Sequence, residues 1–185
     1  MRNLLPSLPS LLILLSAAVS PTVTAADILP DNWQPFSGRV EFRQQKQLQG
    51  MAFPITSSGY LQLDNDTLLW HTRQPVEQQV LISGAGVSQL QQGQMQLIAG
   101  TEIIGQLMLA VLQQNNAFLS TYFQRQPQGD HCQQLTPVKA PVDQFFQHIE
   151  LCGTAQLEQI RLLEKSGNTT SIELHYTTTT TEPEQ

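Results

Sequence analysis

Apolar and polar residues alternate along most of the chain after residue 37, in short runs separated by turn residues. In residues 38–43, Val40 and Phe42 fall on one side of an extended chain, and charged residues fall on the other. Further short, partly apolar runs that indicate strands lie at 59–63, 68–72, 80–82, 87–90 and 94–97. This pattern predicts a meander of short antiparallel strands, each with one apolar face.

Helical spacing replaces the alternation at Thr101. The apolar positions that then recur at this spacing are Ile103, Ile104, Leu107, Met108 and Val111. The spacing predicts a helix that Thr101 caps and that Asn115 and Asn116 end, with a second helical turn over residues 117–123. Strands are expected to resume at 132–135, 145–151, 157–163 and 170–176.

Together these elements predict a mainly β domain in which one or two helices are inserted into a long antiparallel sheet. The apolar strand faces and the apolar side of the helix must pack together to leave water. If the sheet curls around the helix, the space between them is a packed core. If the helix lies loosely as a lid, the same surfaces line a pocket for acyl chains. Periodicity does not separate these two interpretations, so both stay open.

The N-terminal segment has the features of a cleaved secretion signal. A short cationic start precedes an apolar, leucine-rich run over residues 4–20, and small residues then lead to a cleavage site after Ala25 or Ala26. An uncleaved membrane anchor is the alternative. Pro6 and Pro9 interrupt the apolar run and no Lys or Arg cluster follows it, so the cleaved signal is the favoured interpretation.

This signal divides the chain into three expected parts. Residues 1–25 are the signal peptide, residues 26–176 the folded domain, and residues 177–185 a Thr-rich tail that is expected to be disordered. Loss of Arg2 with the signal leaves eight Lys and Arg against fifteen Asp and Glu. An acidic domain of this kind is a poor nucleic-acid binder.

Both cysteines, Cys132 and Cys152, belong to the expected exported domain. Two cysteines in an exported domain indicate one disulfide. Neither cysteine has a second Cys or His at ligand spacing, so no metal site is expected.

The sequence also lacks the motifs of the common catalytic sites. It has no Gly-x-Ser-x-Gly elbow and no Gly-rich phosphate loop, and its four histidines are isolated from one another. We therefore expect no catalytic residues, no cofactor and no enzymatic activity.

An ordered set of short motifs resembles a known family. The motifs are a Phe-x-Gln strand at Phe42, a Gly-led strand at Gly59, a Leu-x-Trp-x-x-x-x-Pro strand from Leu68 to Pro75, a Val-x-x-x-Gly hairpin at Val80 and a final hairpin at 167–172. In this order, and spread over most of residues 36–176, they resemble the periplasmic lipoprotein carrier family LolA.

The resemblance implies an incomplete, half-open antiparallel β-barrel of the LolA/LolB type, covered by a helical lid. It also implies a monomeric carrier in the periplasm of a Gram-negative cell, which holds the acyl chains of a lipoprotein or lipid in an apolar cavity. Such a carrier receives its cargo from an inner-membrane exporter and delivers it to an outer-membrane acceptor through transient contacts. The residues expected to line the cavity are Val40, Phe42, Leu61, Leu63, Leu68, Trp70, Ile104, Leu107, Met108, Val111 and Phe146. For each of them, an ordinary place in the core is the alternative.

Two other functions stay open. Lipoprotein carriers have an Arg-Pro-Asn step before the aromatic strand, and this chain has Asp64-Asn65-Asp66 there. The difference favours, as an alternative, a dedicated carrier for a glycolipid, a polyene or another acylated product with its own exporter. A module that binds a protein through the exposed face of Arg39, Glu41 and Arg43, without lipid cargo, is the other alternative.

Overall fold

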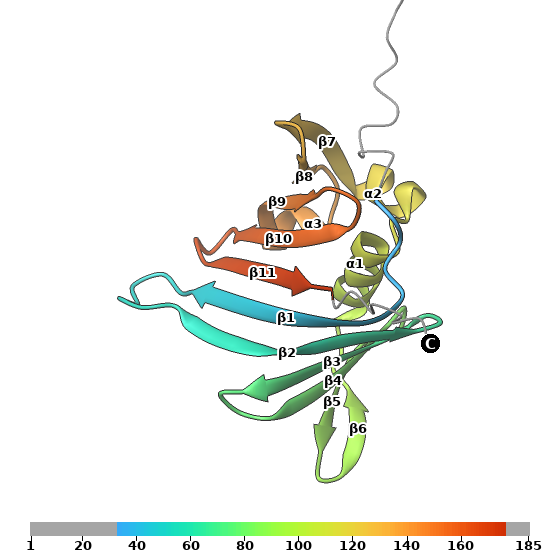
Figure 1. Cartoon of the computed structure of the whole chain (residues 1–185), viewed down its shortest axis with the longest axis vertical. Helices are drawn as coiled ribbons and strands as arrows, with labels where there is room; N and C mark the ends of the chain where they lie inside the picture. The colour runs from blue at the N-terminus through green and yellow to red at the C-terminus, as the bar shows by residue number, and fades with distance from the viewer. Residues whose placement is uncertain (1–32, 177–185) are drawn as a thin grey trace, which may run out of the picture.

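A computed structural model describes residues 33–176 of the chain, which form one sheet and three helices (Figure 1). The first six strands are β1 (Gly38–Gln47), β2 (Ile55–Asp64), β3 (Thr67–Gln74), β4 (Gln78–Ser83), β5 (Gly86–Gln91) and β6 (Gln94–Leu97). The helices are α1 (Glu102–Leu112), α2 (Asn116–Tyr122) and α3 (Val142–Phe145). The remaining strands are β7 (Phe123–Gln128), β8 (Cys132–Pro137), β9 (Phe146–Gly153), β10 (Leu157–Glu164) and β11 (Thr169–His175). The signal peptide predicted at 1–25 and the tail predicted at 177–185 lie outside the described residues.

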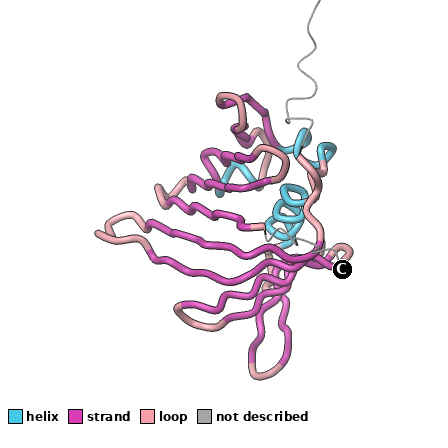
Figure 2. The backbone as a smooth tube through the Cα atoms, in the orientation of Figure 1, coloured by secondary structure: helices cyan, strands magenta, loops and turns pink. Residues whose placement is uncertain are grey.

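All eleven strands belong to a single antiparallel sheet with the order β6-β5-β4-β3-β2-β1-β11-β10-β9-β8-β7. The pairing of β1 with β11 joins the first and last parts of the chain, and β6 and β7 are the two edges, so the sheet is not closed. Figure 2 shows the strands as one curved layer, with α1 and α2 together beside one side of it. The predicted mainly β fold, an open antiparallel sheet with inserted helices, is confirmed.

The alternation along β1 explains why the sheet has two different faces. Val40 and Phe42 are only 1% and 2% exposed, whereas Arg39 and Arg43 on the other side of the strand are exposed. We call the face that carries Val40 and Phe42 the inner face, and the opposite one the outer face. The inner face buries its apolar side chains together with α1, and this burial is the main stabilising contribution to the fold.

Helix α1 begins where the sequence predicts, with Thr101 at its N-cap position. The Thr101 hydroxyl makes no capping bond; it accepts a hydrogen bond from the Val87 amide (2.8 Å) and donates one to the Ile98 carbonyl (2.6 Å). Its side chain therefore ties the start of the helix to β5. Gly105 lets the helix lie close to the end of β4, because a Cβ added at Gly105 would lie 2.3 Å from the Ser83 carbonyl oxygen. Helix α1 is thus held directly against the β4–β5 turn.

The segment before β1 ties α1 to the other half of the sheet. The Trp33 indole donates to the Gly153 carbonyl (2.9 Å), and the Phe36 amide donates to the Leu112 carbonyl at the end of α1 (2.9 Å). The Tyr176 hydroxyl donates to the Leu157 carbonyl (2.8 Å). Burial, together with the nearby charge of Glu158, raises the pKa of Tyr176 to about 12.

Among residues 33–176, no helix has the length and apolar character needed to cross a membrane.

The sequence analysis missed two elements, β7 and α3. β7 has the sequence FQRQPQ and only Phe123 is buried, so it shows no apolar alternation. Pro127 is tolerated because β7 is an edge strand, where a missing amide leaves no partner unpaired. α3 is a single turn, and it takes Phe145 out of the strand predicted from that residue.

The predicted disulfide is present. Cys132 and Cys152 are bonded and stand directly opposite each other in β8 and β9. The bond links the neighbouring strands β8 and β9, next to the edge strand β7.

Glu164, at the end of β10, makes the stability of the fold depend on pH. Its carboxylate accepts hydrogen bonds from Lys46 Nζ (3.1 Å), Ser166 Oγ (3.0 Å) and Asn168 Nδ2 (3.0 Å). Burial acts to raise its pKa, but these three bonds and the Lys46 charge together lower it by more, so the pKa lies below the ordinary 4.5. A carboxyl group with a lowered pKa stabilises the fold above its unfolded-state pKa, and the contribution is lost as the pH falls below 4.5.

We therefore expect Glu164→Gln to be destabilising at neutral pH and nearly neutral at about pH 3. Urea unfolding of both proteins at the two pH values measures this difference. Glu173→Gln, at an exposed position of the neighbouring strand, is the control and is expected to change the stability little at either pH. A penalty for Glu164→Gln that is the same at both pH values would contradict the prediction.

Candidate functional site

The inner face of β1, β2 and β3 brings six of the predicted cavity residues into one patch. Cross-strand register places Val40 opposite Leu61, Leu61 opposite Trp70, and Leu63 opposite Leu68. Five of the six are at most 7% exposed: Val40, Phe42, Leu61, Leu63 and Leu68. Alternation therefore identified the inner face of these strands correctly.

Trp70 completes this patch at its border. It is half-buried, and its ring meets Phe42 edge-on, with centroids 5.0 Å apart. On the other side it stands opposite Val80 in β4. Trp70 thus joins the packed interior to the more exposed part of the inner face.

Helix α1 packs against β4 and β5 and supplies a second group of predicted residues. Leu107 and Val111 are 3% and 5% exposed and belong to the core. Met108 is half-buried and packs against the core, whereas Ile104 is half-buried and lies outside that packed set. The structure thus brings the helix and the strands together, as expected.

Phe146 is the predicted residue farthest from this group in the sheet order. It opens β9, is half-buried and packs against the core. The packing of the predicted residues fits both a core and a cavity lining, and their role in ligand binding stays a prediction.

The sequence analysis left out most of the inner face on β8 to β11. The apolar residues of these strands that are at most 4% exposed are Leu135, Ile149, Leu151, Leu157, Ile160, Ile172 and Leu174. The signal was present at 170–176, which alternates as clearly as the run at 38–43, whereas the apolar positions of 157–163 do not keep a two-residue period. The apolar inner face therefore continues across the β1–β11 pair, where Phe42 stands opposite Leu174.

Two buried polar residues, Gln133 of β8 and Thr170 of β11, interrupt this part of the inner face, and Gln133 is the more deeply buried of the two. Gln133 of β8 is 0% exposed, and neither its Oε1 nor its Nε2 has a hydrogen-bond partner within the described part of the chain. No signal in a single sequence marks a glutamine as buried, because glutamine is mostly an exposed residue.

The outer face of β1 to β3 carries a network of charged and aromatic side chains that pair with one another. The Arg39 guanidinium lies 3.6 Å above the centre of the Tyr60 ring and also bonds Glu41 (3.1 Å). Arg73 pairs with Glu41 as well, and the Tyr60 hydroxyl bonds His71 Nδ1 (2.8 Å). The face considered for a protein partner is thus largely occupied by its own ion pairs.

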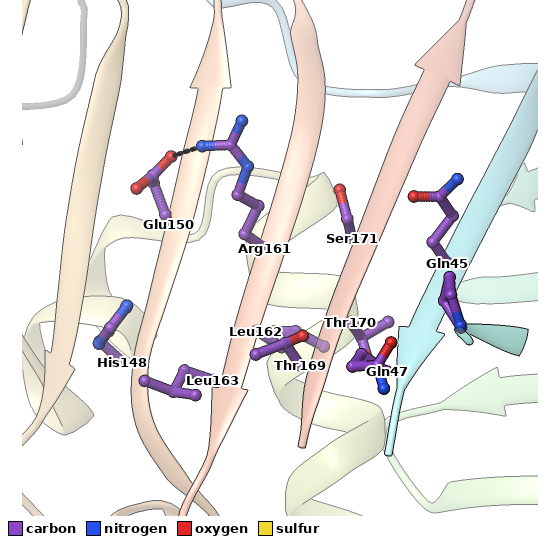
Figure 3. A pocket seen from close by; sticks show the side chains of 11 residues that line it. Gln45, Gln47, His148, Glu150, Arg161, Leu162, Leu163, Thr169, Thr170 and Ser171 are labelled. Carbon is purple, nitrogen blue, oxygen red and sulfur yellow. Dashed lines mark hydrogen bonds and ion pairs between the residues drawn. The ribbon is translucent and has the colours of Figure 1, made fainter. Parts of the chain in front are cut away.

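A hollow of about 390 Å³, lined by both apolar and polar side chains, also lies on the outer face, over β1, β11, β10 and β9 (Figure 3). Arg161 Nη1 and Glu150 Oε1 form an ion pair across it (2.6 Å), and His148, Ser171 and Gln45 point into the same region. Because Arg161 and Glu150 pair with each other, the hollow offers apolar surface from Pro54 and Leu163 together with uncharged hydrogen-bonding groups.

Cys132, Glu150 and Cys152 bring three possible metal-ligating atoms within 4.8 Å of one another. Both sulfur atoms are in the disulfide, so Glu150 is the one ligand that this cluster offers. The cluster therefore does not fit a metal ion.

No protein-family model matches the chain, and no curated protein matches it. Among solved structures, the chain is similar to a LolA superfamily protein, NE2245 from Nitrosomonas europaea. The two sequences are 11% identical, and the match covers 78% of this chain and 86% of that chain, with a TM-score of 0.47.

Proposed function

We propose that the chain is a periplasmic carrier that holds the acyl chains of a lipoprotein or lipid against the inner face of its sheet. The observation that supports this most is the extent of the inner face, which is apolar on both sides of the β1–β11 pair and is backed by α1. Each buried methylene gains about 0.8 kcal/mol on leaving water, so acyl chains do not cross an aqueous compartment without such a surface.

Entry of an acyl chain requires α1 and α2 to move, because the inner-face side chains pack against one another. The helices are suited to this movement, since both lie in the connection between the edge strands β6 and β7. Half-buried apolar residues mark the border between sheet and helix, among them Trp70, Ile103 and Met108. In this proposal α1 swings about its anchored start at the β4–β5 turn.

Export and partners belong to the same proposal. The apolar N-terminal run and the Cys132–Cys152 bond support an oxidising compartment such as the periplasm. The ordered motifs shared with LolA support transfer from an inner-membrane exporter to an outer-membrane acceptor. No catalytic step is needed, because the cargo changes place and not covalent structure.

A dedicated carrier for one acylated product is the second candidate. The observation that favours it is Asp64-Asn65-Asp66, which stands where lipoprotein carriers have an arginine. The mass of the cargo separates the two candidates, since a lipoprotein adds a polypeptide and a glycolipid or polyene does not.

Met108→Arg tests the proposed site. Met108 is half-buried at the border of the core, so an arginine there can keep its guanidinium in water when no ligand is bound, and the domain can still fold. A bound acyl chain would have to lie against that charge. We expect the affinity for a fluorescent fatty acid to fall about tenfold or more, and the unfolding midpoint to change much less. Leu107→Arg is not suitable, because Leu107 is 3% exposed and a buried charge there would unfold the domain.

Gln106→Arg is the matched control, because Gln106 is exposed on the same helix. It is expected to bind the fatty acid like the wild type. A folded Met108→Arg variant with unchanged affinity would place the acyl chains elsewhere, and a wild-type protein that binds no fatty acid would contradict the carrier.

A further inference from the structure

Gln133 occupies a position that the surrounding sheet builds for an apolar side chain. It shares the inner face of β8 with Leu135, and it stands opposite Leu151 in β9 and Pro127 in β7. Leu135 and Leu151 are 0% and 1% exposed, so the amide is enclosed by packed hydrocarbon. The outer-face neighbour Gln134, by contrast, is half-buried and bonds Thr136.

The Gln133 amide is unfavourable for the fold. Its Nε2 has two hydrogens to donate and its Oε1 two lone pairs to offer, yet neither atom has a partner among residues 33–176. A buried polar group without a partner loses its hydrogen bonds to water and gains none in return. A methionine of similar volume would fill this position without that loss. Contacts within the described residues therefore do not explain why this position carries an amide and not an apolar side chain.

We propose that Gln133 binds the carbonyl linkage of an acylated ligand, the ester or amide group that joins the acyl chain to the rest of the molecule. This inference rests on the proposed carrier function and names the chemical class of its cargo. Nε2 donates to the carbonyl oxygen of an ester, and for an N-acyl group Oε1 also accepts from the amide N–H. The acyl chain then lies along the inner face of β8 and β9, where Leu151 stands opposite Gln133 and Ile149 stands opposite Leu135.

The hydrogen-bonding groups of the buried amide explain why this recognition is selective between ester and ether lipids. An ether lipid has the same hydrocarbon but no carbonyl oxygen, so it leaves the buried amide without a partner. A site built around a hydrogen bond rejects a ligand that lacks the matching group more strongly than an apolar site rejects an extra methylene. The carrier therefore distinguishes acyl ligands from alkyl ligands of equal length.

A monoacylglycerol and its alkyl glycerol ether with the same chain length are the probes for this proposal. Both are uncharged, and they differ at the carbonyl group. We expect the wild-type protein to bind the ester about five- to tenfold more tightly than the ether. We expect Gln133→Met to bind the two lipids equally and to unfold at a higher temperature than the wild type, because the unpartnered amide is gone.

Gln134→Met is the control for a change of amide to thioether in the same strand, and it is expected to keep the preference for the ester. A wild-type protein that binds both lipids equally, or a Gln133→Met variant that keeps the preference, overturns the role of Gln133 and leaves the carrier function standing. Failure of the wild type to bind either lipid overturns the carrier function and this inference with it.

Discussion

Phe42→Ala is expected to lower the free energy of unfolding by about 3–5 kcal/mol. Phe42 is 2% exposed, and its ring packs edge-on against Trp70 with centroids 5.0 Å apart. The cavity left by the ring has little to fill it, because the residue opposite Phe42 in β2 is Gly59, which has no side chain. On the other side the neighbour is Leu174 in β11, so the same change weakens the contact between the two halves of the sheet.

Urea unfolding followed by tryptophan fluorescence measures this loss, with Trp70 reporting next to the cavity. Phe53→Ala is the matched control, because Phe53 is 80% exposed and its truncation is expected to change the stability by no more than about 0.5 kcal/mol. Equal effects of the two substitutions would contradict the placement of Phe42 in the core.

Removal of the Cys132–Cys152 bond is expected to lower the free energy of unfolding by about 3 kcal/mol. The two residues are 20 positions apart, and the bond restricts the unfolded chain over that loop. The double variant Cys132→Ser, Cys152→Ser measures the effect at equilibrium. Its control is the wild type after reduction, which should unfold at the same urea concentration as the variant. A variant as stable as the oxidised wild type would contradict the expected contribution.

Much of the fold follows from the sequence because most strands lie between an apolar layer and water. This is clearest in β1, where Val40 and Phe42 alternate with Arg39, Glu41 and Arg43. In α1 the predicted stripe matches the buried residues only in part. Leu107 and Val111 are buried as expected, but Leu109, Ala110 and Leu112 are buried as well, because the last turns of the helix are enclosed on more than one side. The prediction fails at β7, because an edge strand rich in glutamine has no apolar face to reveal it.

The candidate site was predicted less completely than the fold. The residues proposed from the sequence come mainly from β1, β2, β3 and α1, while much of the inner face belongs to β8 to β11. Gln133 was missed because its burial depends on the pairing of β8 with β7 and β9. The local alternation within β8 does not reveal which strands lie beside it. Gln133 lies two positions from Leu135 on the same strand face, but an isolated polar residue at such a position does not indicate burial.

Native mass spectrometry of the full chain purified from the periplasm of a Gram-negative host tests the central claim most directly. We expect protein ions with an added mass that is released on collisional activation and is identified as an acylated molecule. Its fragments should include an ester- or amide-linked acyl chain. A protein that is recovered without such a molecule, and that also fails to take up monoacylglycerol when it is offered, would contradict the account.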